Sequence, residues 1–591
     1  MRLGKKFTRG FLPSLLCLVA MLVVACGGSS GTGSGASTSG ATSKAPANQQ
    51  IYIYPEDTVS DIATFDPGLS TDLNSIQAID LVFTGLVQLD DNLKVQPQLA
   101  ASYQQMPDGL TWKFTLRPNL KFSDGTPLTS QDVIYSINRA LQPAEKSIVG
   151  PLYLALIKDS SKLVAGKIKT IIGDSLMAPD PNTVVIVTSK KAAYFLDALT
   201  YSCSYVVEKS LVDKYGTKFT DHLTEGGGDG PFKVASYTHG QNIVFVPNPN
   251  YYGPIPQLKK VIYPFYKDLE TVYKAYQVGQ VDSTGGYSLP SADLANARQL
   301  TNEFHQVPQL WINYYAMNYL VKPFDNIKIR QAFDLAANKE VIQHAVWKDS
   351  VIATNHIVPK GMPGYTPNLT GPDGVASLAG DQAKAKMLFQ QGLQEEGWSS
   401  VSQVPPTTLT YSTGNKDAEN EVSALQQMWQ STLGISVKAD AIDFNKLLAE
   451  TEAALNNPKG LQFWGIGWIA DYPDPQDWTT LQFDKGANYN QMNYGQNNTS
   501  DAAQQQAVQQ QLEAADTMPP GEARLQQYMN TEQQLVNDVA WMPMEQVTVA
   551  LLQKPCVAGV VYNPQLLTPP NDWGAVYIST ATPCANTSSY Q

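Results

Sequence analysis

The first 24 residues constrain this chain more than any other segment, because they decide the compartment in which the rest of it folds. Residues 1–9 carry four positive charges and no acid. Residues 11–24 then form an almost unbroken apolar run, FLPSLLCLVAMLVV. That run is too short for a standard membrane-spanning helix and is typical of a secretory signal. The chain is therefore expected to fold outside the cytoplasm.

Small residues lead directly from the apolar run into a cysteine, Val23-Val24-Ala25-Cys26. This ending resembles the lipobox of bacterial lipoproteins, in which the Cys becomes the first mature residue and carries the lipid. The resemblance implies a signal peptide over residues 1–25, lipidation at Cys26 and a membrane anchor. A plain signal peptide with an incidental Cys is the alternative. Residues 27–50 are rich in Gly, Ser, Thr and Ala without a hydrophobic period, so residues 26–50 are predicted to be a flexible linker.

The remaining cysteines fit an exported protein. Cys17 leaves with the signal peptide, and Cys556 and Cys584 lie in one C-terminal segment, where we predict a disulfide. Cys203 lies in an apolar stretch and is expected to be a buried thiol, although other pairings stay open. The five His residues are scattered and form no spaced set with Cys, so no metal site and no cofactor are expected.

Composition excludes several classes of protein. A chain of 591 residues is long enough for several folding units, and 43% apolar residues can build a core, which excludes a disordered body. The net charge of −12 makes the chain a poor ligand for polyanions, so we expect no nucleic-acid binding.

Local patterns predict interleaved strands and helices. Asp108-Gly109 signals a hairpin turn within residues 107–135, and Thr129 can cap a helix over residues 131–141 with Asp132 in its first turn. Further helices are predicted over residues 326–346, 381–396, 501–516 and 522–537. This alternation indicates an α/β protein with mixed sheets.

Four segments, in order, resemble the family 5 extracellular solute-binding proteins of ABC importers, the oligopeptide- and dipeptide-binding type. They are Phe65-Asp66-Pro67 with residues 81–141, then GDGPFKVASYTHGQNIVFVPNPNYYG (228–253), YYAMNYLVKPFDNIKIRQAFDLAANKEVI (314–342) and GWIADYPDPQDW (467–478).

The resemblance implies a two-lobed fold like that of periplasmic binding proteins, type II, cluster C. It is α/β with mixed sheets, two crossing segments between the lobes and an extra subdomain in lobe one. We expect lobe one over residues 51–310 with the subdomain near 86–224, lobe two over 311–545, and a return segment of lobe one over 546–591.

The same resemblance implies a monomeric receptor that captures oligopeptides or dipeptides between two closing lobes and delivers them to a membrane permease. It would be held by its lipid on the outer face of the cytoplasmic membrane. The alternative is the same role for an oligosaccharide, a nickel chelate or an opine. A secreted hydrolase is disfavoured, because no nucleophile stands beside a general base, and we expect no enzyme.

The resemblance also supplies candidate binding residues. In peptide-binding members an Asp at the place of Asp471 pairs with the ligand's α-ammonium, a charge that needs an anionic partner in a water-poor cleft. The competing interpretation of Asp471 is the start of a proline-rich turn. Backbone at Gly467, Trp468 and Ile469 would run beside the ligand. From lobe one and the crossing region, the candidates are Thr71, Asp72, Leu73, Tyr287 and Tyr314, with a bland loop or aromatic core as the alternatives.

One position departs from the family pattern. Many peptide binders carry an Arg two residues before the Gly-Trp pair, where it can meet the ligand's C-terminal carboxylate, but this chain has Gly465. The departure leaves the ligand's length and its carboxylate partner open.

Overall fold

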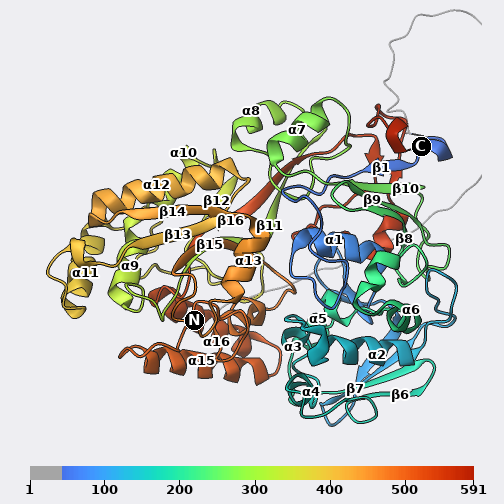
Figure 1. The fold of residues 1–591 in the computed structure, drawn as a ribbon, viewed down its shortest axis with the longest axis horizontal. Helices are drawn as coiled ribbons and strands as arrows, with labels where there is room; N and C mark the ends of the chain where they lie inside the picture. The colour runs from blue at the N-terminus through green and yellow to red at the C-terminus, as the bar shows by residue number, and fades with distance from the viewer. Residues whose placement is uncertain (1–42, 591) are drawn as a thin grey trace, which may run out of the picture. The chain divides into compact units, whose positions relative to one another are not determined.

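Five β-sheets organise residues 43–590, the part of the chain that the computed structural model describes (Figure 1). The predicted signal peptide, residues 1–25, and the predicted lipidation site, Cys26, lie outside these residues. Strands and helices alternate along the chain, which is the mixed α/β class that the sequence predicts. Over the same residues, no helix combines the length and the apolar character that crossing a bilayer requires.

The first sheet joins early and middle parts of the chain. Its strands are β1 (Ile51–Ile53), β8 (Phe232–Thr238), β9 (Asn242–Pro247) and β10 (Lys260–Pro264), in the order β1-β10-β9-β8. Helix α1 (Leu73–Val82) shares a hydrophobic core with this sheet. Asp72 caps the helix, since its Oδ1 accepts a hydrogen bond from the Ser75 N–H at 2.9 Å. The cap fixes the chain just before α1.

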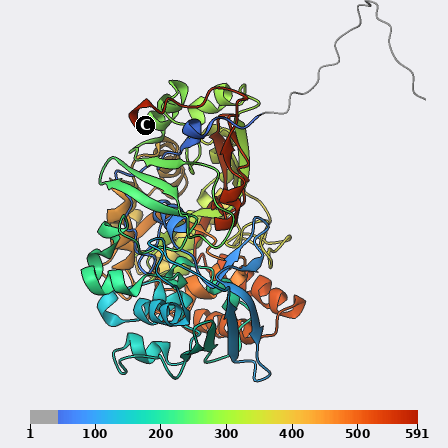
Figure 2. The ribbon, with the colours of Figure 1, turned by 90° about the vertical axis from the view of Figure 1, so that its right-hand side faces the viewer.

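The structure corrects the end of the predicted linker, residues 26–50, because residues 43–50 belong to the folded body. The Ala45 N–H donates to the Ile578 carbonyl at 2.8 Å, and the Gln50 side chain is 1% exposed and bonds both backbone groups of Ile578. Figure 2 shows this early segment beside the C-terminal one. These contacts use backbone and one amide, so hydrophobic periodicity does not reveal them.

A second, antiparallel sheet has its own core. Its strands are β4 (Ala100–Gln105), β5 (Thr111–Leu116), β6 (Leu176–Asp180) and β7 (Thr183–Val187), in the order β4-β5-β7-β6. Helix α2 (Ser130–Ala140) packs on it, and Thr129 and Asp132 form a capping box. The predicted turn at Asp108 and the predicted capped helix are confirmed. Around this core lie β2 (Val87–Leu89), β3 (Val95–Pro97), α3 (Gly150–Tyr153), α4 (Ser160–Val164), α5 (Phe195–Ala198) and the 3-10 turn η3 (Ser202–Ser204). Helix α6 (Lys209–Tyr215) instead packs in the core of the first sheet.

The largest sheet contains the two longest strands. Its order is β12-β16-β11-β15-β13-β14, with β11 (Phe304–Met317), β12 (Val351–Ala353), β13 (Thr407–Ser412), β14 (Val437–Ile442), β15 (Phe463–Ile469) and β16 (Met542–Leu552). β11 and β16 are antiparallel neighbours. At one end, Ala550 and Leu552 pack with Ile53 of the first sheet, whereas at the other end Met317 and Met542 pack in the core of the large sheet. These two strands therefore connect two separate cores.

Helices α9 (Ile327–Ala336), α10 (Lys339–Ala345), α11 (Gln382–Glu395) and α12 (Lys416–Leu433) build the core beside the large sheet. The single helix predicted over residues 326–346 is wrong, because it is two helices. Ala337 is extended, and Asn338 starts the second helix by accepting from the Val341 N–H at 2.9 Å. An Asn side chain that bonds a nearby backbone N–H competes with the backbone hydrogen bonds that would continue a helix through it.

The remaining helices complete both regions. α13 (Phe444–Glu452), α14 (Thr480–Phe483), α15 (Ala502–Thr517) and α16 (Glu522–Asn537) belong with the large sheet, and α7 (Leu269–Gln277) and α8 (Leu294–Ala297) with the first. α15 and α16 follow the predicted ranges to within one residue.

The C-terminal segment returns to the first sheet. β17 (Val557–Ala558) and β18 (Tyr577–Ile578) pair, and Trp573 packs against Phe232. Cys556 and Cys584 are joined by a disulfide, the pairing expected from the sequence, and Cys203 is a buried free thiol.

Candidate functional site

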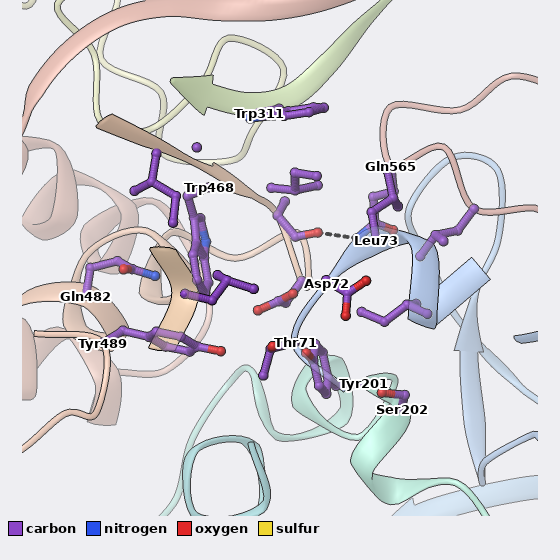
Figure 3. A pocket seen from close by; sticks show the side chains of 18 of the residues that line it. Thr71, Asp72, Leu73, Tyr201, Ser202, Trp311, Trp468, Gln482, Tyr489 and Gln565 are labelled. Carbon is purple, nitrogen blue, oxygen red and sulfur yellow. Dashed lines mark hydrogen bonds between the residues drawn. The ribbon is translucent and has the colours of Figure 1, made fainter. Parts of the chain in front are cut away.

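A cavity of about 200 Å³ lies between the N-terminus of α1 and strand β15 (Figure 3). Figure 3 shows Trp468 and Tyr489 on one side of it, and Asp72 and Leu73 on the other. All nine residues that the sequence nominates for ligand binding lie on its wall: Thr71, Asp72, Leu73, Tyr287, Tyr314, Gly467, Trp468, Ile469 and Asp471. Segments almost 400 positions apart thus meet at one place.

Asp471 stands two residues past the end of β15. Its Oδ2 accepts a hydrogen bond from the hydroxyl of Tyr153, which belongs to the core of the β4–β7 sheet. The Tyr153 ring stacks on the Tyr201 ring at 3.8 Å. Burial raises the pKa of Asp471 to about 7, although the Tyr153 hydroxyl opposes the rise. A carboxylate in this position is short of positive charge, and a cationic group beside it would restore its ionised form.

Asp477 holds the backbone around Asp471. It is fully buried, and its Oδ2 accepts from the Asp471 N–H and from the Trp468 indole N–H, each at 3.2 Å. Burial, followed by the charge of Asp471, raises the pKa of Asp477 well above its usual range. Trp468 also meets Tyr489 edge to face at 4.6 Å. Asp477 therefore fixes the place of both neighbours.

Asp474, three residues after Asp471, already has a cationic partner. The guanidinium of Arg524 makes two 2.7 Å bonds to the carboxylate of Asp474, which also accepts from the Gln476 N–H as the cap of the turn Pro475–Asp477. Both side chains are buried. This pairing leaves Asp471 without a cationic partner in the described chain.

Strand β15 presents a free edge to the cavity. Its even-numbered residues bond β11, as the 2.8 Å bond from the Ala470 N–H to the Leu310 carbonyl shows. Backbone groups alternate along an antiparallel pair, so those of Gly467 and Ile469 face the other edge. There β13 pairs only with Phe463 and Trp464. The two residues can therefore bond an extended ligand.

Gly467 is required by its neighbours. A Cβ at this position would lie 2.2 Å from the indole nitrogen of Trp311 and 2.6 Å from the Asn313 side-chain oxygen. Both groups come from β11, in which Asn313 lies opposite Gly467 and Trp311 lies opposite Ile469. The glycine lets both side chains lie flat over the strand.

Acids line the wall contributed by α1. Asp72 uses one oxygen as the helix cap, while its other oxygen is buried without a partner. Asp80 lies in the last turn of α1, is 8% exposed and also has a buried carboxylate oxygen without a partner. Burial raises the pKa of Asp80 to about 7.

Two of the nominated aromatic residues differ in exposure to the cavity. Tyr314 stacks face to face on Trp541 at 3.6 Å and packs in the core beside the large sheet, so only its edge reaches the wall. Tyr287 is half-buried and meets the Trp311 ring edge to face at 5.6 Å. Its hydroxyl donates to the Asn74 side chain at 3.4 Å.

The departure at Gly465 has a physical cause. The ring of Tyr315 covers this residue, and a Cβ there would lie 2.7 Å from the ring. No larger side chain fits without moving Tyr315, whose hydroxyl bonds the Glu421 carboxylate at 2.9 Å. The space that an Arg would need is occupied.

Several wall residues escaped the sequence reasoning. They are Asp80, Tyr201, Tyr489 and Gln565, which no motif marks. Tyr153, outside the matching segments, reaches the site through its hydrogen bond to Asp471. The Gln565 amide bonds the Ala470 carbonyl at 2.6 Å. Only tertiary packing brings these side chains to the cavity.

Metal ligation finds little support in the described residues. One group of three has suitable spacing, Asp282 with Cys556 and Cys584, but the two sulfurs form the disulfide and are not thiolates.

A family model described as bacterial extracellular solute-binding proteins, family 5 Middle, matches residues 94–490. Among curated proteins, the oligopeptide-binding protein OppA of Bacillus subtilis is 26% identical over 479 residues, 80% of this chain and 84% of that protein. The dipeptide-binding protein DppE of the same organism is 26% identical over 529 residues, 88% and 91% of the two chains.

A solved structure, the murein tripeptide binding protein MppA of Escherichia coli, superposes with a TM-score of 0.78 at 23% identity. The match covers 90% of this chain and 98% of that one. The two-lobed fold implied by the sequence is therefore the fold observed here.

Proposed function

Because the chain belongs to the bacterial extracellular solute-binding proteins of family 5, we propose that it is the peptide-binding receptor of an ABC importer. Its similarity to an oligopeptide-binding and a dipeptide-binding protein, across most of both chains, supports a peptide as the ligand. The chemistry required is recognition alone.

One observation carries this proposal: Asp471 is a half-buried acid in a cavity whose wall contains no Lys, Arg or His among the described residues. Burying an unpaired carboxylate is costly, and a free peptide brings the missing partner in its α-ammonium. The ammonium would sit beside Asp471 and bond the same oxygens that face Tyr153. The ligand's charge and the protein's charge then compensate each other.

The peptide's own backbone would extend along β15. Gly467 and Ile469 offer backbone groups that no strand occupies, so the ligand would add as a short neighbouring strand. Main-chain bonding does not depend on side chains. This arrangement therefore accepts peptides of varied sequence.

Ligand contacts come from both cores, which links binding to closure. Thr71 to Leu73 approach from one side and β15 from the other, and the Tyr153–Asp471 bond joins the two directly. Tyr472 also packs among residues of the β4–β7 core. Contacts that exist only when the lobes meet would shift the population toward the closed state.

We assign the lobes as the crossing strands suggest. β11 and β16 contain the proposed boundaries near residues 310 and 546, so lobe one spans 51–310 and 546–591, and lobe two spans 311–545. The antiparallel sheet β4–β7 lies within the proposed subdomain, 86–224. We also propose that lipid on Cys26 holds the receptor on the outer face of the cytoplasmic membrane, where it meets the permease.

Calorimetry with matched peptides tests the proposal. Unblocked pentaalanine should bind the purified protein, whereas N-acetyl-pentaalanine, which lacks the ammonium but keeps every backbone group, should bind far more weakly. Equal affinity for both peptides would remove Asp471 from ammonium binding. Failure of all peptides, with binding of an oligosaccharide or a chelated metal instead, would overturn the peptide function itself.

A further inference from the structure

A second cavity of about 200 Å³ continues the first one along the cleft. The two share six wall residues, Tyr287, Trp311, Tyr314, Phe444, Ile466 and Gly467, so that one elongated space runs along β15. Between them, the indole N–H of Trp311 is buried without an acceptor. A ligand lying along β15 would pass this donor and enter the second cavity.

Two buried carboxyl groups face each other in the wall of the second cavity. Glu421 of α12 is 3% exposed and Glu545 of β16 is 2% exposed. Glu421 accepts hydrogen bonds from the Tyr315 hydroxyl at 2.9 Å and the Trp347 indole at 2.5 Å, and Glu545 accepts from the Asn313 amide at 2.9 Å. The two carboxyls are close enough to share a hydrogen bond.

The whole cleft is acidic. Six acids line the two cavities, namely Asp72, Asp80, Glu421, Glu452, Asp471 and Glu545, and the described walls contain no Lys, Arg or His. Asp80 adds an unpartnered carboxylate oxygen that is buried in the wall. A peptide with one ammonium compensates only part of this charge.

The second cavity also has the wall that an organic cation prefers. Tyr315, Trp347, Tyr411 and Trp311 line the same cavity as the carboxyl pair, and the faces of aromatic rings attract positive charge. The ligand's terminal carboxylate finds no cation there, because Tyr315 occupies the place beside Gly465. Charge and shape thus favour a guanidinium or an ammonium over a carboxylate.

Building on the proposed function, we propose that the second cavity takes the cationic side chain of a lysine or arginine in the bound peptide. The receptor then selects peptides that carry positive charge beyond their N-terminus. An extended chain advances by roughly 3.3 Å per residue, as β15 does. Glu545 accepts from Asn313, which lies opposite Gly467, four residues before Asp471, so the selected side chain is roughly the third to fifth from the ammonium.

Proton release accompanies this capture. Burial raises the pKa of both Glu421 and Glu545, and the charge of Glu421 raises that of Glu545 further, so the empty pair resists double ionisation. Besides each other, the titratable groups that face the pair are the Tyr315 hydroxyl and the ammonium of Lys339, and Tyr411 lies beside Tyr315. The charge of Lys339 opposes the rise in the pKa of Glu545, but its ammonium pairs with Asp334 at 3.0 Å and donates to the Asn355 side chain at 2.7 Å. A second cation favours the doubly ionised pair and expels the proton.

The test is calorimetry with unblocked pentapeptides of alanine that carry one lysine, scanned over positions 2 to 5, against the same peptides with norleucine. At one of these positions, lysine should bind about tenfold or more tightly than norleucine. Titrations in phosphate and in Tris should show more protons released by that lysine peptide. Glu421→Gln and Glu545→Gln keep the shape and should remove the preference while pentaalanine still binds.

Glu452→Gln is the matched control, because it removes an exposed acid from the first cavity and should leave the lysine preference unchanged. If norleucine binds as well as lysine at every position, the inference is overturned and the peptide function stands. If Glu452→Gln abolishes the preference as fully as Glu545→Gln, the cationic side chain is not in the second cavity. If no unblocked peptide binds, the proposed function fails first.

Discussion

Replacing Asp471 by Asn should separate ligand binding from stability. The side chain keeps its size and can still accept from the Tyr153 hydroxyl, but it no longer carries charge. A peptide's ammonium would then be buried without an anionic partner, which costs about 3–5 kcal/mol. The dissociation constant for unblocked pentaalanine should rise by a factor of about 100 to 1,000 or more, whereas that for the N-acetyl peptide should hardly change.

The same substitution should stabilise the empty protein. Folding raises the pKa of Asp471 from its ordinary value of 3.8 to about 7. The cost of this burial is absent at pH 3, where the carboxyl is protonated in both states, grows above pH 4, and is complete above pH 7. Asn removes this cost. The free energy of unfolding of the variant should therefore exceed that of the parent by about 2–4 kcal/mol at pH 8 and equal it near pH 3.

Urea unfolding at the two pH values, together with calorimetry, measures both effects. Asp471 faces Tyr153, Tyr201, Tyr489, Cys203 and Asp477, none of which supplies positive charge. Affinity of the parent for pentaalanine should therefore fall about tenfold per pH unit below pH 7, as Asp471 takes up its proton. Unchanged affinity in the variant, or a loss of stability at pH 8, would refute the reasoning.

Three further outcomes follow from the packing. Gly467→Val should weaken peptide binding and destabilise the protein by about 1–3 kcal/mol in urea unfolding, because the new side chain collides with β11; full affinity would contradict the close approach. Arg524→Met should lower the free energy of unfolding, measured with urea, by about 3–5 kcal/mol, because Asp474 is left buried and unpaired; adding Asp474→Asn should recover part of the loss. Replacing both Cys556 and Cys584 by Ser should lower stability by about 3–4 kcal/mol, and an unchanged melting temperature would argue against a structural role for the bond.

Local sequence patterns and the order of the motifs are enough to predict much of the fold. The turn at Asp108, the capping box at Thr129 and the bounds of α16 rest on interactions within a few residues, so the sequence alone predicts them. Of the nine candidate residues, which share one cavity, Tyr314, Gly467, Trp468, Ile469 and Asp471 lie within the matching segments, whereas Thr71, Asp72, Leu73 and Tyr287 lie outside them.

Tertiary packing decided what the sequence could not show. Nothing near Tyr153 distinguishes it from a core tyrosine until Asp471, 318 positions away, meets its hydroxyl. No motif marks Glu421 or Glu545, and only the packing of α12 on the large sheet brings them together. The break at Asn338 was missed because a capping Asn and a mid-helix Asn look alike in an amphipathic pattern.

A crystal structure of the protein with an unblocked lysine-containing pentapeptide tests the central claim most directly. The peptide's terminal nitrogen should lie within hydrogen-bond distance of the Asp471 carboxylate, with its backbone bonded to Gly467 and Ile469 and its lysine directed at Glu421 and Glu545. A peptide bound in the reverse direction, or outside the two cavities, would contradict the account.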